Sequence, residues 1–186
     1  MEEAYRITDP QVLKVVAHPL RVRMLGMLRA EGPATASQLA RKVGESSGST
    51  SYHLRELAKY GFIEEDPSED GRERRWCARH MYTSWDNVQM AATAEGREAV
   101  QIMKMRQVEA LARTVESFDQ GEWSDDWVAV AGMSDLIATL PPEGVKEFHE
   151  RAEALVLELE ERFAGHSGNR PALIFLAGYP RREESP

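Results

Sequence analysis

The sequence predicts a mainly α-helical protein with a small β component, an α+β fold. Three short helical patterns follow one another between about residues 19 and 60, and a hairpin pattern comes directly after them. The second half combines long helical patterns with two apolar runs that are typical of strands. We therefore expect an N-terminal domain over residues 1–83, followed by a helical region with a small antiparallel sheet over residues 84–186.

Composition is that of a globular protein of the cytoplasm. Apolar residues make up 42% of the 186 residues, which is enough for a core. No apolar run approaches the roughly 18 residues of a membrane span, and the acidic start lacks the apolar stretch of a secretory signal. The single cysteine, Cys77, excludes an internal disulfide and fits a reducing compartment. We expect a cytoplasmic protein without membrane contact.

The net charge of −8 is unevenly distributed along the chain. Residues 1–80 carry a net charge of +1, whereas residues 81–186 carry −9. The acidic second half favours solubility and repels phosphate. Any contact with nucleic acid is therefore expected from the N-terminal half.

The first helices are predicted from their end signals. A short helix opens at Pro10 and a second opens at Pro19, since proline is favoured in the first turn of a helix. A third helix, capped by Thr35 or Ser37, ends at Gly44. These helices have short connections, as expected for neighbours in a small domain.

The next stretch, GSTSYHLRELAKYGFIEED (48–66), predicts a helix and then a strand. Leucines at 54 and 57 face inward, and Gly61 ends the helix. The Asp70-Gly71 pair is a strong hairpin turn signal, and residues 72–80 form the expected returning strand. Three helices followed by a hairpin predict a winged helix-turn-helix.

Small hydroxyl residues at the front of this helix suit entry into the major groove of DNA. Their side chains can bond phosphates or base edges, and the N-terminal end of the helix dipole favours phosphate. Arginines beside the hairpin turn can reach phosphate or the minor groove. The predicted DNA-binding residues are Ser47, Ser49, Thr50, Ser51, Tyr52, His53, Arg55, Arg72, Arg74 and Arg75.

Plainer interpretations of the same residues remain open. The serines can serve as a capping cluster and the arginines as a solvated surface. His53 can be a core residue that bonds a backbone carbonyl group instead of DNA.

A long helix predicted over residues 97–119 has a broad apolar face. Its spacing of three and four residues favours contact both with its own domain and with a second chain. The predicted dimerisation residues are Met103, Val108, Leu111, Val115 and Phe118.

The remaining region predicts two strands, near 126–140 and 172–179, with a helix between them from about residue 141 to residue 164. Four apolar side chains in this region are candidates to line a pocket for a small apolar effector, although an ordinary core role explains them as well. They are Trp123, Trp127, Met133 and Phe148.

The N-terminal half resembles the ArsR-type winged helix transcriptional regulators. The matching segments are HPLRVRMLGML (18–28), ASQLARKVG (36–44), GSTSYHLRELAKYGFIEE (48–65) and RERRW (72–76). The Ser-x-x-Ser-x-His-Leu-x-x-Leu arrangement of that family's recognition helix is closely matched by Ser47 to Leu57. The second half is similar to an actinobacterial subset with Ser84-Trp85-Asp86, a tryptophan pair and Tyr179-Pro180-Arg181. The resemblance implies a homodimer that binds a partly palindromic operator and represses transcription.

The metal ligands of that family are missing from the corresponding positions. Metal-sensing members carry Cys-x-Cys where this chain has residues 37–40 without a thiol, and residues 97–119 contain no histidine. Cys77 is alone, and Glu147, His149 and Glu150 share one acidic helix that we interpret as a solvated face. We expect no metal and no cofactor.

The sequence therefore predicts a regulator that binds double-stranded DNA as a homodimer. One alternative is a regulator gated by a small apolar ligand, and another is a winged helix used only for protein interaction. An enzyme is not expected, because the chain has no phosphate-binding glycine loop and no recognisable catalytic set.

Overall fold

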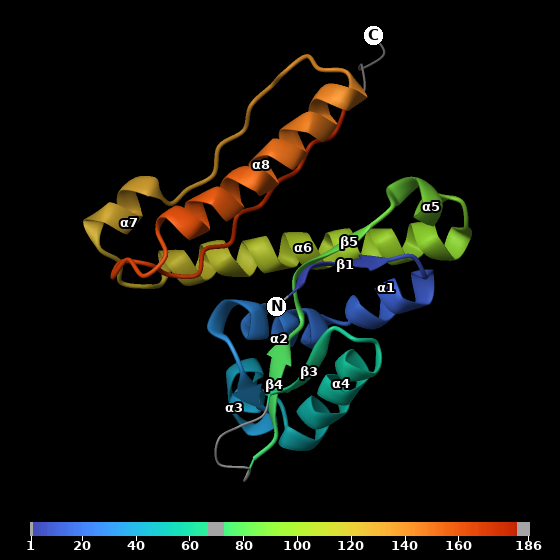
Figure 1. Cartoon of the computed structure of the whole chain (residues 1–186), viewed down its shortest axis with the longest axis vertical. Helices are drawn as coiled ribbons and strands as arrows, with labels where there is room; N and C mark the ends of the chain where they lie inside the picture. The colour runs from blue at the N-terminus through green and yellow to red at the C-terminus, as the bar shows by residue number, and fades with distance from the viewer. Residues whose placement is uncertain (1, 67–72, 182–186) are drawn as a thin grey trace. The chain divides into compact units, whose positions relative to one another are not determined.

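The computed structural model describes residues 2–66 and 73–181 and is mainly helical with small sheets, as predicted. Its elements are β1 (Glu2–Ile7), α1 (Pro10–Val16), α2 (Pro19–Glu31), β2 (Ala34–Thr35), α3 (Ala36–Val43), α4 (Ser47–Lys59), β3 (Ile63–Asp66), β4 (Arg75–Ala78), β5 (His80–Trp85), α5 (Asn87–Ala91), α6 (Ala94–Asp119), α7 (Asp125–Val130) and α8 (Pro142–Arg162) (Figure 1). Among the described residues, no helix has both the length and the apolar character needed to cross a membrane.

Two compact units divide the chain, residues 1–113 and residues 114–186, and the boundary falls within α6. The predicted functional boundary after residue 83 lies earlier, because α5 and most of α6 belong to the first unit. Gly96 shows how closely α6 approaches α5, since a Cβ atom at this position would overlap the carbonyl oxygen of Met90.

The helices of the first unit begin and end at the predicted signals. The carboxylate of Asp9 accepts a hydrogen bond from the Gln11 backbone at 2.8 Å and caps α1. Thr35, one of the two predicted caps, forms a capping box with Gln38 at the start of α3. After α4, Gly61 adopts a φ of 77°, a conformation that favours glycine.

The predicted wing is confirmed in its strands. An antiparallel three-stranded sheet has the order β2-β4-β3, and its wing pairing runs from Ile63 opposite Ala78 to Asp66 opposite Arg75. The predicted turn at Asp70-Gly71 lies outside the described residues. The expected returning strand over 72–80 is interrupted, because β4 ends at Ala78 and β5 begins at His80.

Strand β5 follows β4 in the chain but does not belong to the wing sheet. It pairs in parallel with β1 in a separate two-stranded sheet. This pairing is not predicted by the sequence, because its two strands are far apart in the chain. The buried core of the first unit is built from helices α1 through α6 and from both sheets. Its most completely buried large side chains are Ile7, Leu13, Met24, Leu39, Leu54, Leu57, Phe62, Ile63 and Met90.

The second unit consists of the end of α6, α7, α8 and extended connections. The prediction of strands near 126–140 and 172–179 was wrong. The first stretch begins with α7, whose acidic first turn and preceding Ser124 favour a helix start, and the second has no regular secondary structure. Residues near Gly178 lie beside α8, because a Cβ atom there would be 2.9 Å from Cγ1 of Val145.

Candidate nucleic-acid interface

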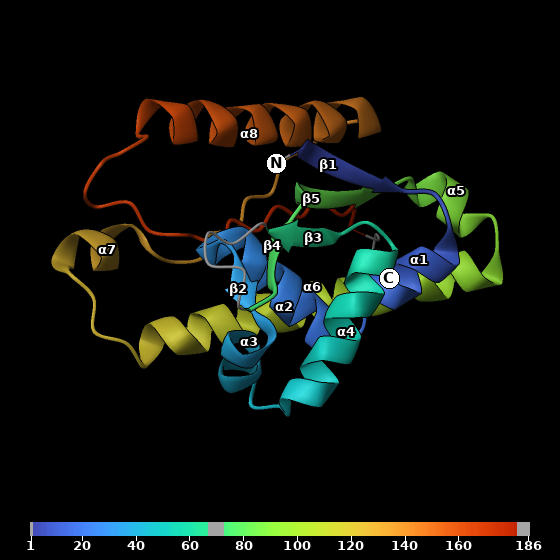
Figure 2. The ribbon, with the colours of Figure 1, turned by 60° about the horizontal axis from the view of Figure 1, so that its bottom comes forward.

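Helices α3 and α4 pack against each other and are joined by a short turn of residues 44–46 (Figure 2). Gly44 ends α3 with a φ of 76°, a left-handed conformation that costs glycine little. Ser46 then caps α4, its hydroxyl oxygen accepting a hydrogen bond from the backbone nitrogen of Ser49 at 3.2 Å. This local chemistry fixes the direction in which α4 leaves α3.

One face of α4 is buried in the core of the first unit. Leu54 and Leu57 are fully buried, as predicted from their spacing. The opposite face is formed by Gly48, Tyr52, Arg55 and Lys59, which are all exposed. Their spacing of four, three and four residues aligns them along the helix, and we call them the α4 stripe.

The α4 stripe has a glycine, where another molecule can come close to the helix backbone, and it has polar and cationic side chains. Gly48 has open space around it, since a Cβ atom added there would meet only Ser46 Oγ, at 4.0 Å. Tyr52 is 52% exposed, so about half of its surface is accessible. Ser47 is also exposed, whereas Ser49 and Ser51 are half-buried beside the stripe. These residues can bond phosphates or base edges.

Two of the predicted DNA contacts do not fit this geometry. Thr50 is fully buried, and within the described structure its hydroxyl oxygen has no hydrogen-bond partner. His53 is 9% exposed and lies on the core side of α4. The prediction that Thr50 and His53 contact DNA is therefore replaced by a structural role, because both side chains point into the protein.

His53 is held by α2 rather than by a backbone carbonyl group. The Nε of Arg21 donates to Nδ1 of His53 at 3.3 Å, and Arg21 also donates to the carbonyl oxygen of Val15 at 2.8 Å. The ring of His18, which caps α2, lies 4.3 Å from the ring of His53 between centroids. These contacts connect α4 to the start of α2 from behind the α4 stripe.

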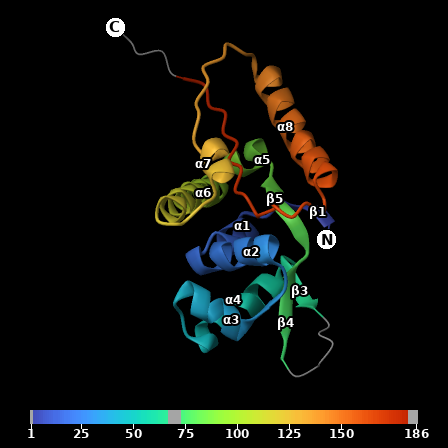
Figure 3. The same cartoon turned by 90° about the vertical axis from the view of Figure 1, so that its left-hand side faces the viewer.

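Strands β3 and β4 of the wing lie side by side (Figure 3). The arginines of the wing differ in their surroundings. Arg74 is exposed, pairs with Glu65 at 3.1 Å and lies over the ring of Trp76 at 5.7 Å. Arg75 is half-buried and donates to the carbonyl oxygen of Pro33 at 2.6 Å, so part of its role is to hold the wing. Arg72 lies outside the described residues.

The predicted dimerisation residues fall on two sides of α6. Met103 is 5% exposed and belongs to the core of the first unit, so its assignment to a dimer interface is corrected. Val108, by contrast, is 56% exposed. It follows Met103 by five residues, which turns its side chain about 140° around the helix axis from that of Met103. Leu111 and Phe118 are half-buried and Val115 is exposed.

The four residues predicted to line an effector pocket are not enclosed. Met133 is 75% exposed, Phe148 50% and Trp123 38%, and Trp127 is half-buried. The Trp123 indole stacks on Phe118 instead, with 5.2 Å between ring centroids. Their predicted role in a pocket therefore has no support from burial in a single chain.

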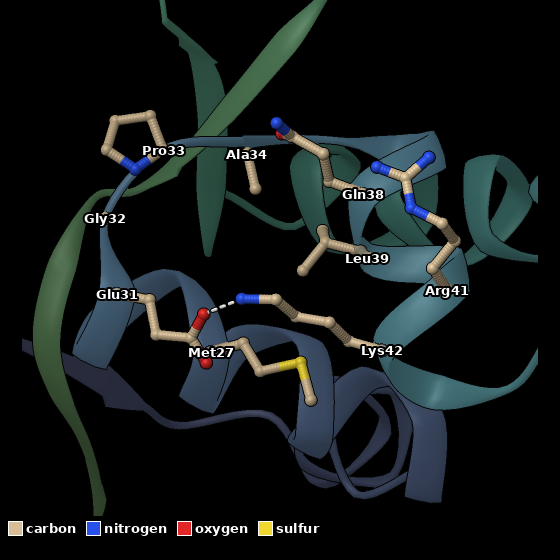
Figure 4. Close-up of a pocket in the computed structure, with 9 residues that line it drawn as sticks. All are labelled: Met27, Glu31, Gly32, Pro33, Ala34, Gln38, Leu39, Arg41 and Lys42. Atoms are coloured by element: carbon tan, nitrogen blue, oxygen red, sulfur yellow. Dashed lines mark hydrogen bonds and ion pairs between the residues drawn. The ribbon is translucent and has the colours of Figure 1, made fainter.

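A shallow surface pocket of about 360 Å³ lies between the end of α2 and α3 (Figure 4). It is lined by Met27, Glu31, Gly32, Pro33, Ala34, Gln38, Leu39, Arg41 and Lys42. Glu31 and Lys42 form an ion pair across it. None of the predicted effector residues lies there.

No group of three or more histidine, cysteine or acidic side chains suited to a metal ion occurs in the part of the chain that the structure describes. The thiol of Cys77 is half-buried, and burial raises its pKa, with Glu64 and Asp66 adding to this effect. A raised pKa keeps the thiol protonated and unreactive.

Sequence reasoning missed one residue of the candidate interface and one residue that supports it from behind. Lys59 completes the α4 stripe, and its spacing from Arg55 would have placed it there. Arg21 has no comparable signal, because a charged residue on an amphipathic helix is normally expected to face solvent.

Comparison with known proteins identifies the class of domain to which α2, α3 and α4 belong. A family model described as a helix-turn-helix domain matches residues 16–66, which include α2, α3 and α4. The N-terminal part of the chain thus carries a helix-turn-helix domain, a class of domain typical of DNA-binding regulators.

Among solved structures the likeness is more distant. The crystal structure of RV1404 from Mycobacterium tuberculosis matches with 18% sequence identity and a TM-score of 0.32, covering 85% of this chain and 86% of that chain. No curated protein matches the chain.

Proposed function

We propose that this protein is a sequence-specific, DNA-binding transcriptional regulator of the ArsR type that acts as a homodimer. The observation that carries the proposal is the exposed α4 stripe, presented by a helix-turn-helix domain whose other face is anchored in a core. In this proposal α4 is the recognition helix and enters the major groove. The protein would act in the cytoplasm as a repressor that binds its operator.

Base recognition would depend on the exposed residues of α4 and phosphate recognition on its start. Tyr52 and Arg55 stand in the middle of the helix, where they can reach base edges. Ser47 and Ser49 lie at the N-terminus, where hydroxyl groups and backbone nitrogens suit phosphate. Arg74 at the wing would add a phosphate or minor-groove contact.

Pairing of two chains would use the part of α6 that does not face the first unit's core. Val108, Leu111 and Val115 repeat at three and four residues there, as in a helix-pairing seam. A two-fold pair of domains would place two α4 helices about one turn of DNA apart, roughly 10 base pairs. The preferred operator would then be partly palindromic.

A winged helix used only for protein interaction is the competing function. The α4 stripe contains no large aliphatic side chain, and its two cations are better suited to phosphate than to an apolar partner. A regulator gated by a small apolar ligand remains a variant of the main proposal, with the ligand bound in the second unit.

Selection of bound sequences from a random duplex DNA pool tests the proposal. We expect enrichment of a motif with two related half-sites about 10 base pairs apart, centre to centre. Retention of DNA without any enriched motif would contradict sequence-specific recognition, and a single half-site would contradict the homodimer.

A further inference from the structure

A cluster of two imidazoles and two guanidinium groups lies behind the recognition helix. His18 and Arg21 come from the start of α2, His53 from α4 and Arg106 from α6. Arg21 is 8% exposed and His53 is 9% exposed, while His18 is half-buried. His53 thereby links α4 to the start of α2, and Arg106 is near enough to His18 to act on its charge.

Both imidazoles accept a hydrogen bond through the same atom. Nδ1 of His18 accepts from the backbone nitrogen of Leu20 at 3.2 Å, which caps α2. Nδ1 of His53 accepts from Nε of Arg21 at 3.3 Å. An imidazole accepts only in its neutral form, so each ring carries its single proton on Nε2. Protonation of either Nδ1 atom would remove the bond that it accepts.

The charges around the cluster also favour neutral rings. Arg21 and Arg106, the latter paired with Glu109 at 2.6 Å, repel a positive charge at His18, and the two rings lie close enough to repel each other when protonated. Burial lowers the pKa of His18 first, and then the charges of His53, Arg21 and Arg106 lower it further.

His53 is surrounded by charges of both signs. Burial and the neighbouring Arg21 lower its pKa, while the carboxylates of Glu45 and Glu56 oppose this effect without reversing it. Glu56 also lies 3.9 Å from Arg21, and so partly neutralises the group that His53 faces.

We propose that His18, Arg21 and His53 are positioning residues that hold the recognition helix α4 in its DNA-binding orientation, and that protonation of the two imidazoles releases it. The inference rests on the proposed DNA-binding function. Its consequence is that the affinity for DNA falls as the pH decreases through the range in which these histidines titrate.

The direction of this effect distinguishes it from simple electrostatics. Two added positive charges near the interface would strengthen attraction to phosphate at low pH. Release of α4 would weaken binding despite those charges. The two explanations therefore predict changes of opposite sign.

The stability of the protein should follow the same direction. A histidine with a folded-state pKa below its unfolded value of about 6.5 binds more protons when unfolded in the range between the two values. The contribution of these two histidines to the free energy of unfolding is then fully present above about pH 6.5 and is lost as the pH falls through that range. This measurement requires no DNA.

The test uses the full chain and a duplex carrying the motif from the selection experiment. We expect the dissociation constant measured by fluorescence anisotropy to increase about tenfold between pH 7.5 and pH 5.5. Equal or tighter binding at pH 5.5 overturns the inference. Absence of binding at pH 7.5 would instead contradict the proposed function, and the unfolding measurement then tests the cluster alone.

The double variant His18→Asn and His53→Asn is the matched test. Asparagine places an oxygen near the position of Nδ1, so it can accept the same hydrogen bonds but does not titrate. Because its hydrogen bonds do not depend on pH, we expect this variant to have the same dissociation constant at pH 7.5 and at pH 5.5. The exposed His166→Asn variant should keep the full dependence.

A retained pH dependence in the double variant would overturn the inference. If that variant does not fold, NMR titration of the unmodified protein replaces it. Folded-state pKa values of about 6.5 or higher for both rings would then contradict the proposal.

Discussion

The two compact units differ in how far they bury their apolar side chains. In the first unit a single core buries large side chains such as Leu54 and Phe62 completely. In the second unit none of the described side chains is buried, and Leu136 and Ile137 are 92% and 80% exposed. Folding requires apolar burial to offset the conformational entropy of the chain. The first unit meets this requirement itself, whereas the apolar side chains of the second lack such cover within their own unit.

This difference fits the proposed division of roles between the two units. The proposed DNA-reading surface, the α4 stripe, lies on the unit with its own core, so its geometry does not depend on a partner. The second unit has apolar surface to contribute, and the proposed homodimer offers a way to cover it. Recognition and assembly would thus be assigned to different parts of the chain.

The largest expected effect is on the stability of the first unit. Replacing the fully buried Phe62 by alanine should lower the free energy of unfolding by about 3–5 kcal/mol, because it leaves a cavity. The matched change Phe148→Ala, at a side chain that is 50% exposed, should cost less than about 1 kcal/mol. Denaturant unfolding measures both, and equal losses would contradict the comparison.

The second effect concerns assembly. Leu111→Asp combined with Val115→Asp should give monomers in sedimentation experiments, because charges would replace apolar contacts in the proposed seam. DNA affinity should fall by about 100-fold or more as the avidity of two reading heads is lost. Ser117→Asp, exposed on another side of α6, should leave the dimer intact. A dimeric double variant would mean that pairing occurs elsewhere.

The third effect concerns base recognition. Tyr52→Ala removes an exposed ring from the centre of the α4 stripe without touching the core. We expect a loss of about 1–3 kcal/mol against the preferred operator and a changed preference at one or two base positions. Repeating the sequence selection with the variant measures this change. A uniform loss for all sequences would identify Tyr52 as a backbone contact.

The smallest effect is expected at the wing. Arg74→Ala should weaken binding to all sequences to a similar extent and reduce the slope of log affinity against log salt by about 1. Arg74 is the clearer choice, since Arg75 also supports Pro33 through a hydrogen bond. Titrations at several salt concentrations check this, and an unchanged slope would remove the wing from the interface.

Much of the first unit could be predicted because its signals are local. Helix ends at Thr35, Gly44 and Gly61 depend on capping and on glycine conformation, and both are visible in the sequence. The outward position of Tyr52 follows from its separation along the sequence from Leu54 and Leu57, which face the core. The burial of Thr50 and His53 was missed because polar residues at the front of a helix are usually exposed.

The errors in the second unit have a different cause. An apolar run such as residues 172–179 predicts a strand only if another strand is available to pair with it. The structure places Gly178 beside Val145 of α8 instead. Similarly, Met103 and Val108 both belong to the apolar pattern of α6, and only the packing of the first unit distinguishes the core residue from the exposed one.

Cross-linking from α4 tests the central claim most directly. A photoreactive phenylalanine analogue would replace Tyr52 in one variant and Val88, which is 83% exposed on α5, in another. With the selected operator duplex, we predict a strong cross-link to bases from position 52 and little from position 88. Cross-linking from position 88 alone, or from neither position in a complex that forms, would contradict the assignment of α4 as the recognition helix.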